Sequence, residues 1–232
     1  MKKTLILSGI LAVITAMPCR AWWIGNPARY IEKDKTSVQF LYDTGEKKVI
    51  ESDNAAKVDL NSHRFYIQLQ RGHNYGFQTF ARFLPSTGRL NFKNSDFNPH
   101  LFGTGVGLQW SPQEPIGPVS VGILGAVDYA FGSTKRKDGQ SGHDSVSWAE
   151  GSVAAGASVA VFENLKVYGG LSLIRSDIKL DVSGTETNWE NDKEYGPYLG
   201  LDFLANEAWS LSAEVHTMNE TTWNLSARYS FQ

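Results

Sequence analysis

Apolar and polar residues alternate with a period of two along most of the chain after residue 30. Successive side chains of a β-strand point to opposite faces of a sheet, so this period predicts strands with one apolar and one polar face. Helical periodicity is hard to find in the same region. The pattern predicts ten strands, at about 36–43, 61–71, 74–84, 100–110, 118–131, 146–162, 165–176, 194–204, 208–217 and 221–231.

Charged residues within the body of these strands keep to the polar face. That face carries seven of them: Arg64, Arg82, Asp128, Glu150, Asp202, Glu214 and Arg228. A soluble β-sandwich would show the same alternation, because it buries the apolar face and exposes the polar one. The alternation therefore predicts strands and leaves both a sandwich and a barrel open.

The links between the predicted strands alternate between short and long. Outer-membrane barrels have short periplasmic turns and longer extracellular loops, whereas a sandwich has no reason to sort its loops in this way. The loop lengths therefore favour a membrane barrel. The long links follow the first, third, fifth and seventh strands, at roughly 44–60, 85–99, 132–145 and 177–193.

Aromatic residues gather at the two ends of the predicted strands, as expected for rings at two membrane–water interfaces. The alternative is an ordinary aromatic core, in which the rings would sit in mid-strand. Rings next to short turns or the C-terminus are Trp110, Phe162, Phe203, Trp209, Tyr229 and Phe231, and rings next to long links are Tyr42, Phe83, Tyr129, Phe131, Tyr195 and Trp223. Those taken as interface aromatics are Trp110, Phe203, Trp209, Trp223, Tyr229 and Phe231.

We therefore predict an all-β fold, a closed antiparallel up-and-down transmembrane β-barrel of ten strands. Hydrocarbon accepts a sheet only when every backbone polar group is paired, which requires the sheet to close on itself. An even number of strands brings both ends of the sheet to the periplasmic side. Eight strands are the nearest alternative, and a secreted soluble β-barrel or β-sandwich that binds a ligand is the rival fold.

The N-terminus has the features of a cleaved secretory signal peptide. Lys2 and Lys3 precede an apolar run of about thirteen residues, which is short for a membrane-spanning helix. Cys19-Arg20-Ala21 then places small residues at the −3 and −1 positions of a cleavage site, and cleavage would remove the single cysteine. A lead-in segment follows, which could rest at the periplasmic interface or enter the lumen. The expected divisions are 1–21 for the signal peptide, 22–35 for the lead-in and 36–232 for the barrel.

The final stretch Leu225-Ser226-Ala227-Arg228-Tyr229-Ser230-Phe231 alternates and ends in an aromatic residue. With the signal segment and the alternating strands, it resembles Gram-negative outer-membrane β-barrel proteins, of the small porin-like or OmpA-like kind, over nearly the whole mature chain. The resemblance implies an outer-membrane location, contact with membrane lipid and lipopolysaccharide, and recognition of the last strand by the barrel-assembly machinery. Gln232 departs from the family pattern, because it makes the terminal aromatic penultimate.

Composition and charge exclude several classes of protein. Hydrophobic residues make up 41% and charged residues 20%, which excludes a disordered polymer, and the one apolar run excludes a polytopic helical transporter. A formal net charge of −2 argues against a nucleic-acid partner. The five histidines show no metal-ligand spacing, and no glycine loop opens a helix to hold a phosphate. We expect neither a metal nor a cofactor, and no feature specifies an oligomeric state.

Eight polar residues are expected to line the lumen. A ten-stranded barrel is narrow, so the charges could fill it with salt bridges or line a small pore. Their near balance of sign predicts little ion selectivity. The eight are Arg64, Gln68, Arg82, Asp128, Glu150, Asp202, Glu214 and Arg228.

Glu214 and His216 are the catalytic candidates. They lie two residues apart on one strand, hence on one face, near its extracellular end. A carboxylate beside an imidazole is the minimum for general-base catalysis. The omptin outer-membrane proteases, which this chain resembles in strand count, carry Asp-His and Asp-Asp pairs at the rim, but a second acidic pair is not found here. The sequence favours a non-catalytic surface or structural protein or a narrow diffusion channel, with an outer-membrane hydrolase and a secreted binding protein as alternatives.

Overall fold

The computed structural model describes residues 24–51, 57–92, 100–135, 143–182, 184–191, 195–217 and 221–231. The expected signal peptide, 1–21, lies outside these residues, as do the first two residues of the lead-in. Within the described residues, no helix is long and apolar enough to cross a membrane.

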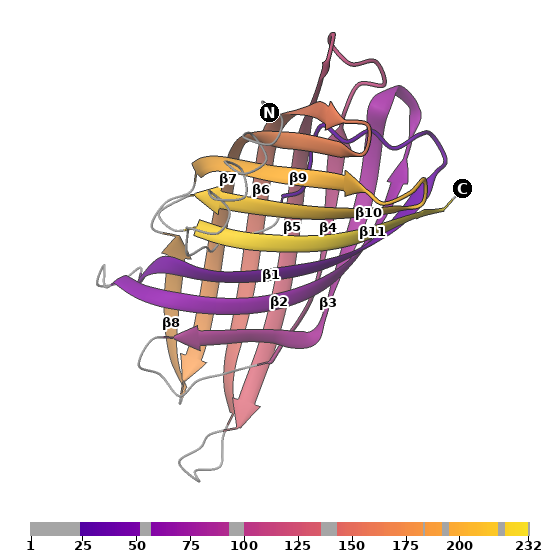
Figure 1. Cartoon of the computed structure of the whole chain (residues 1–232). Coiled ribbons are helices and arrows are strands. Elements are labelled where there is room, and N and C mark those ends of the chain that lie inside the picture. Colours follow the sequence, from indigo (N-terminus) through magenta and orange to yellow (C-terminus); the bar gives the residue numbers. More distant parts are fainter. Residues whose placement is uncertain are drawn as a thin grey trace.

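Eleven strands form a single antiparallel sheet (Figure 1). Ten of them make up a closed barrel wall, and β8 is an additional strand at one end. The bounds are β1 Thr36–Glu51, β2 Lys57–Gly72, β3 Phe77–Phe92, β4 His100–Trp110, β5 Val119–Lys135, β6 His143–Phe162, β7 Leu165–Val182, β8 Thr185–Asn191, β9 Tyr195–Leu204, β10 Trp209–Thr217 and β11 Thr221–Phe231.

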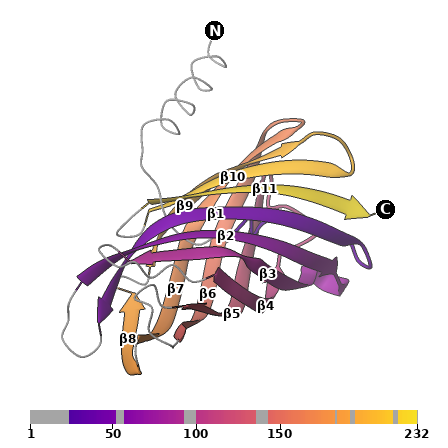
Figure 2. The same cartoon turned by 90° about the horizontal axis from the view of Figure 1, so that it is seen from below.

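The barrel closes where the last strand meets the first. β11 pairs with β1 over nine residues, from Thr36 opposite Phe231 to Thr44 opposite Trp223. Figure 2 shows the two strands side by side on the near wall. The predicted closed barrel of ten strands is therefore confirmed, and the eight-strand alternative is wrong.

The wall exposes its apolar side chains and buries its polar ones, which is the reverse of a soluble protein. Val106, Val127 and Leu171 point outward with 60–70% of their surface exposed. On the same strands, polar residues such as Gln109 and Asp128 point inward and are buried. An exposed apolar belt of this kind requires lipid around it.

The height of the belt fits a bilayer. On β5, the outward-facing side chains from Val121 to Phe131 cover roughly 33 Å of strand at about 3.3 Å per residue. At a strand tilt of about 40° this corresponds to ~25 Å across the membrane, the height of the apolar band in outer-membrane barrels.

Aromatic rings lie at both edges of this belt. At the long-loop edge, Phe102 packs edge-on against Phe83 and Phe131, with centroids 5.2 Å and 5.7 Å apart. At the short-turn edge, Tyr229 lies 5.0 Å from both Trp209 and Phe231. Of the remaining interface candidates, Phe203 is exposed, and Trp110 and Trp223 are half-buried.

The strands are longer than the alternation predicts, so the expected loops at 44–60, 85–99, 132–145 and 177–193 are wrong at their edges. β6 has 20 residues and β7 has 18, about twice the length needed to cross a membrane. Beyond the bilayer both faces of a strand can meet water, so apolar alternation is no longer required there. The backbone nevertheless stays paired there. For example, β5 and β6 are paired as far as Lys135, which lies opposite His143.

Strand β8 is absent from the sequence-based prediction. It pairs with β7 over Asp177–Val182 and with β1 over Val49–Glu51. β7 pairs with β9 only up to Leu173, so β8 continues the wall beyond the ends of β9, β10 and β11. Its single large apolar residue, Trp189, is buried on the inner side.

We expect the folded protein to migrate differently on an SDS gel before and after boiling. A closed sheet has no free edge inside the bilayer, so SDS should leave the barrel intact until heat breaks the whole ladder of hydrogen bonds. The measurement is gel mobility of detergent-extracted protein with and without heating. Identical mobility of the two samples would contradict a closed barrel.

Candidate functional site

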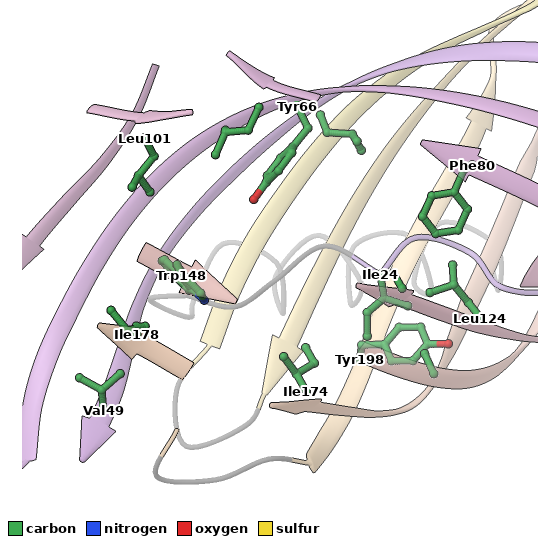
Figure 3. Packing of buried hydrophobic residues seen from close by; sticks show 14 of the residues in the cluster. Ile24, Val49, Tyr66, Phe80, Leu101, Leu124, Trp148, Ile174, Ile178 and Tyr198 are labelled. Atoms are coloured by element: carbon green, nitrogen blue, oxygen red, sulfur yellow. The ribbon is translucent and has the colours of Figure 1, made fainter. Parts of the chain in front are cut away.

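The N-terminal segment runs inside the barrel. We call Ile24–Tyr30 the lumen segment; its residues from Ile24 to Ala28 are buried, although none belongs to the sheet. Figure 3 shows Ile24 among side chains that point inward from the wall, including Leu124, Phe80 and Tyr198. The lead-in therefore enters the lumen, which is one of the two placements that the sequence leaves open.

Wall side chains hold the main chain of the lumen segment through its carbonyl groups. The amide of Gln109 donates hydrogen bonds of 3.3, 3.0 and 2.8 Å to the carbonyl oxygens of Asn26, Pro27 and Arg29. Gln78 donates to the same Arg29 carbonyl at 2.8 Å. The segment turns at this point, because the Arg29 N–H donates to the carbonyl of Asn26.

Two inward carboxylates anchor the other groups of the segment. Asp202 accepts a 2.8 Å hydrogen bond from the side-chain amide of Asn26 and lies 3.9 Å from the guanidinium of Arg29. Glu214 accepts a 2.9 Å hydrogen bond from the backbone N–H of Ile24. The wall carboxylates thus accept hydrogen bonds from N–H donors of the segment, whereas the wall amides donate to its carbonyl groups. The donors and acceptors of wall and segment are therefore complementary.

Glycine allows the segment to lie against β5. A Cβ atom on Gly122 would lie 1.9 Å from the carbonyl oxygen of Pro27, which is far inside van der Waals contact. On β6, a Cβ atom on Gly151 would meet nothing within 4 Å. Gly122 is therefore required by the close approach of the segment, and Gly151 is not.

A separate group of charged and aromatic residues fills the lumen nearer the long-loop end. We call Asp43, Arg64, Trp148, Glu150 and Ser176 the charged cluster. The guanidinium of Arg64 donates two hydrogen bonds to one carboxylate oxygen of Asp43, at 2.9 and 2.5 Å, and lies 4.6 Å over the ring of Trp148. Both Arg64 and Asp43 are at least 95% buried.

The remaining members of the cluster meet at Glu150. The indole N–H of Trp148 donates to one carboxylate oxygen of Glu150 at 3.2 Å, and the hydroxyl of Ser176 donates to the same oxygen. Next to the cluster, Arg82 donates to Gln68 at 2.8 Å and to Asp128 at 3.1 Å. Buried charges cost least when they are paired and hydrogen-bonded, and Arg64 with Asp43 and Arg82 with Asp128 form such pairs.

The structure places all eight expected lumen residues on the inner side of the wall, buried. It distributes them among separate networks. Glu214 and Asp202 bind the lumen segment. Arg64 and Glu150 belong to the charged cluster. Arg82, Gln68 and Asp128 form a group beside that cluster. Arg228 donates two hydrogen bonds, of 2.7 and 3.2 Å, to the side-chain oxygen of Gln39.

Several lumen residues are missing from the sequence-based list. Asp43 follows Tyr42 on the polar face, but it stands at the last residue of its predicted strand. The neutral side chains Gln39, Gln78 and Gln109 also lie on the polar face, and strand phase alone could have found them. Attention to charged residues passed over Gln78 and Gln109, although these two amides donate hydrogen bonds to the lumen segment.

Glu214 and His216 are close together, as their spacing on β10 predicts. His216 Nε2 lies 2.5 Å from Glu214 Oε1, and the other carboxylate oxygen accepts a 2.9 Å hydrogen bond from the hydroxyl of Tyr168. The imidazole stacks on Tyr198. Both members of the pair are at most 1% exposed, so in this conformation neither can touch a substrate.

Solved outer-membrane barrels share this fold. An outer-membrane channel from Pseudomonas putida F1 is 10% identical over 91% of this chain and 100% of that chain, with a TM-score of 0.51. The translocator domain of the autotransporter NalP from Neisseria meningitidis is 12% identical over 87% of this chain and 89% of that chain, with a TM-score of 0.50. No protein-family model matches the sequence, and no curated protein matches it.

This chain has the fold of an outer-membrane β-barrel protein. The shared architecture, the outward apolar belt and the two aromatic edges agree on this point and on a place in a bacterial outer membrane. Identities of 10–12% show a common fold and carry no residue of any site from one barrel to the other.

In the described part of the chain, no cluster of three or more His, Cys, Asp and Glu side chains is arranged to hold a metal ion.

Replacing Arg64 by Met should lower the free energy of unfolding by about 3–5 kcal/mol, because Asp43 would remain buried without its cationic partner. A second replacement, Asp43→Leu, in the same chain should recover much of this loss. Urea unfolding of the barrel in detergent micelles, followed by tryptophan fluorescence, gives both values.

The matched control is Arg71→Met. Arg71 pairs with Asp34 at 3.1 Å, but both side chains are more than half exposed, so its loss should cost less than about 1 kcal/mol. Equal costs for Arg64→Met and Arg71→Met would show that burial does not set the strength of the Asp43–Arg64 pair.

Proposed function

We propose that this barrel is a non-catalytic surface protein whose lumen is closed, and that it presents a β-walled extension to the exterior. The observation that carries the proposal is that the lumen is filled at two levels. The lumen segment fills the short-turn half, and the charged cluster fills the half nearer the long loops.

The filling at both levels uses specific contacts. At the lower level, main-chain groups of the segment are hydrogen-bonded to at least three strands, through Gln78, Gln109 and Glu214. At the upper level, Arg64 is held between Asp43 and the ring of Trp148. A permeating ion or solute would have to break both sets of contacts, so resting conduction is not expected.

The second support is the shape of the wall beyond the membrane. We call 175–182 of β7, strand β8 and 49–51 of β1 the collar. Past Leu173, the outward side chains of β7 change from apolar to charged, and Arg175 and Lys179 pair with Glu190 and Glu186 of β8. At least half of each of these charged side chains is exposed, which supports a position of the collar in water outside the bilayer, on the side that faces the exterior.

A narrow diffusion channel is the second candidate. The lumen segment lies outside the sheet and is held by hydrogen bonds and packing, so its withdrawal would leave the lower lumen open to water. A hydrolase at Glu214 and His216 has less support, because the same contacts that seat the segment also bury this pair.

Lipid and assembly partners remain part of the proposal. The apolar belt requires membrane lipid, and the terminal strand β11 presents Tyr229 and Phe231 on its outer side, as a strand recognised by the barrel-assembly machinery would. Contact with lipopolysaccharide stays an expectation from the sequence resemblance to outer-membrane barrel proteins.

The closed lumen predicts that the purified barrel gives no stable current steps in a planar lipid bilayer. The recording should use protein that shows the SDS heat shift, so that silence reports a closed barrel and not an unfolded one. A large porin reconstituted in the same way is the positive control. Uniform, long-lived steps from the wild-type barrel would overturn the closed state and favour the diffusion channel.

A further inference from the structure

The wall around the lumen segment carries the donors and acceptors of a peptide-binding site. Four consecutive carbonyl groups, from Asn26 to Arg29, each accept at least one hydrogen bond from a wall side chain. The donors are Gln78, Gln109 and Ser111, which come from β3, β4 and the turn after β4. Peptide carbonyls are present in every sequence, so these contacts recognise a main chain.

Side-chain contacts add selectivity to this main-chain recognition. The amide of Asn26 donates to Asp202 and to the hydroxyl of Ser158, while its own side-chain oxygen accepts the N–H of Ala28 and shapes the turn. Arg29 donates to Ser210 at 2.8 Å and faces the carboxylate of Asp202. The wall therefore fits an Asn-Pro turn followed two residues later by a basic side chain.

We propose that the short-turn half of the lumen is a binding site for a short peptide with an Asn-Pro turn and a following basic residue, and that Ile24–Tyr30 is its tethered occupant. The site follows from the contacts of the segment and does not require that the barrel be non-conducting. It adds to the proposed closed state a ligand class that could exchange with the segment.

Tethering explains how a modest peptide site stays filled. The segment is joined to β1 through 31–35, so its effective concentration is in the millimolar range. It therefore occupies the site almost completely even when the free peptide binds with only micromolar affinity. Release from the tether is therefore the condition under which the affinity of the site becomes measurable.

The experiment cuts the tether after the barrel has folded. A recognition sequence for a site-specific protease is inserted after Lys33, which is exposed, and the folded protein is cleaved in detergent. We expect the released N-terminal peptide to co-elute with the barrel on gel filtration. It should exchange with a labelled synthetic peptide of residues 24–33, measured by fluorescence anisotropy.

Substitutions in the peptide test the assigned contacts. Asn26→Ala removes the hydrogen bonds to Asp202 and Ser158 and should weaken binding about tenfold or more. Glu32→Ala changes an exposed side chain and should bind like the wild type. A scrambled peptide of the same composition should not bind.

Substitutions in the wall provide a matched pair. Gly122→Val places a side chain where the Pro27 carbonyl lies, so the cleaved peptide should elute free. Gly151→Val makes the same change on the neighbouring strand with space around it, and the peptide should be retained. The SDS heat shift of each variant shows that the barrel has folded.

Three outcomes would overturn the site: free elution of the wild-type peptide at about 10 µM protein, equal binding of the wild-type and scrambled peptides, or no effect of Asn26→Ala. These results are independent of bilayer conductance. A conducting wild-type barrel that retains the peptide would refute the closed state and keep the site, whereas a silent barrel that releases it would do the reverse.

Discussion

Every backbone N–H and C=O group within hydrocarbon needs a partner, and the pairing of β11 with β1 meets that need for the whole sheet. Without these nine pairs, two strand edges would face lipid with unpaired polar groups. Closure also divides the side chains into two populations. One faces lipid and is apolar, and the other faces an enclosed space in which each polar group must find its partner.

The enclosed space explains the character of the interior. The inner face of the barrel carries buried polar and charged side chains together with aromatic rings. Asp43 and Arg64 neutralise each other beside an indole ring, and neutral glutamines turn toward a piece of the chain's own backbone. Because these groups are buried, losing one partner of a pair costs stability. The other partner is left without a hydrogen bond, and no water takes the place of the lost group.

The parts of this fold that sequence reasoning predicts are those with a local signal. Alternation around Phe102 and Val106 identifies β4, and the same period identifies the other nine wall strands. β8 is not predicted because polar residues occupy both of its faces, with Trp189 as the exception. Its seven residues therefore show no apolar period. Its pairing with β1 joins residues far apart in the chain, such as Val49 and Asn191, and no short window of sequence contains both.

The same reasoning separates the easy and difficult parts of the candidate site. Strand phase predicts that Asp202 and Glu214 point inward, and Glu214 with His216 on one face follows from their spacing. Their contacts with the lumen segment do not follow, since 190 positions separate Ile24 from Glu214. The segment has no hydrophobic period that would predict its path. The need for glycine at position 122 can be explained only once Pro27 is known to lie against it.

The position of the lumen segment has a consequence for the order of biogenesis. Ile24 and Asn26 are among the first residues of the described chain, yet they bind Glu214 on β10 and Asp202 on β9, near its other end. Their docking surface is complete only when nearly the last strand is in place. The lumen segment is therefore synthesised before the strands that bind it, and its contacts with Glu214 and Asp202 can form only after β9 and β10 have joined the wall.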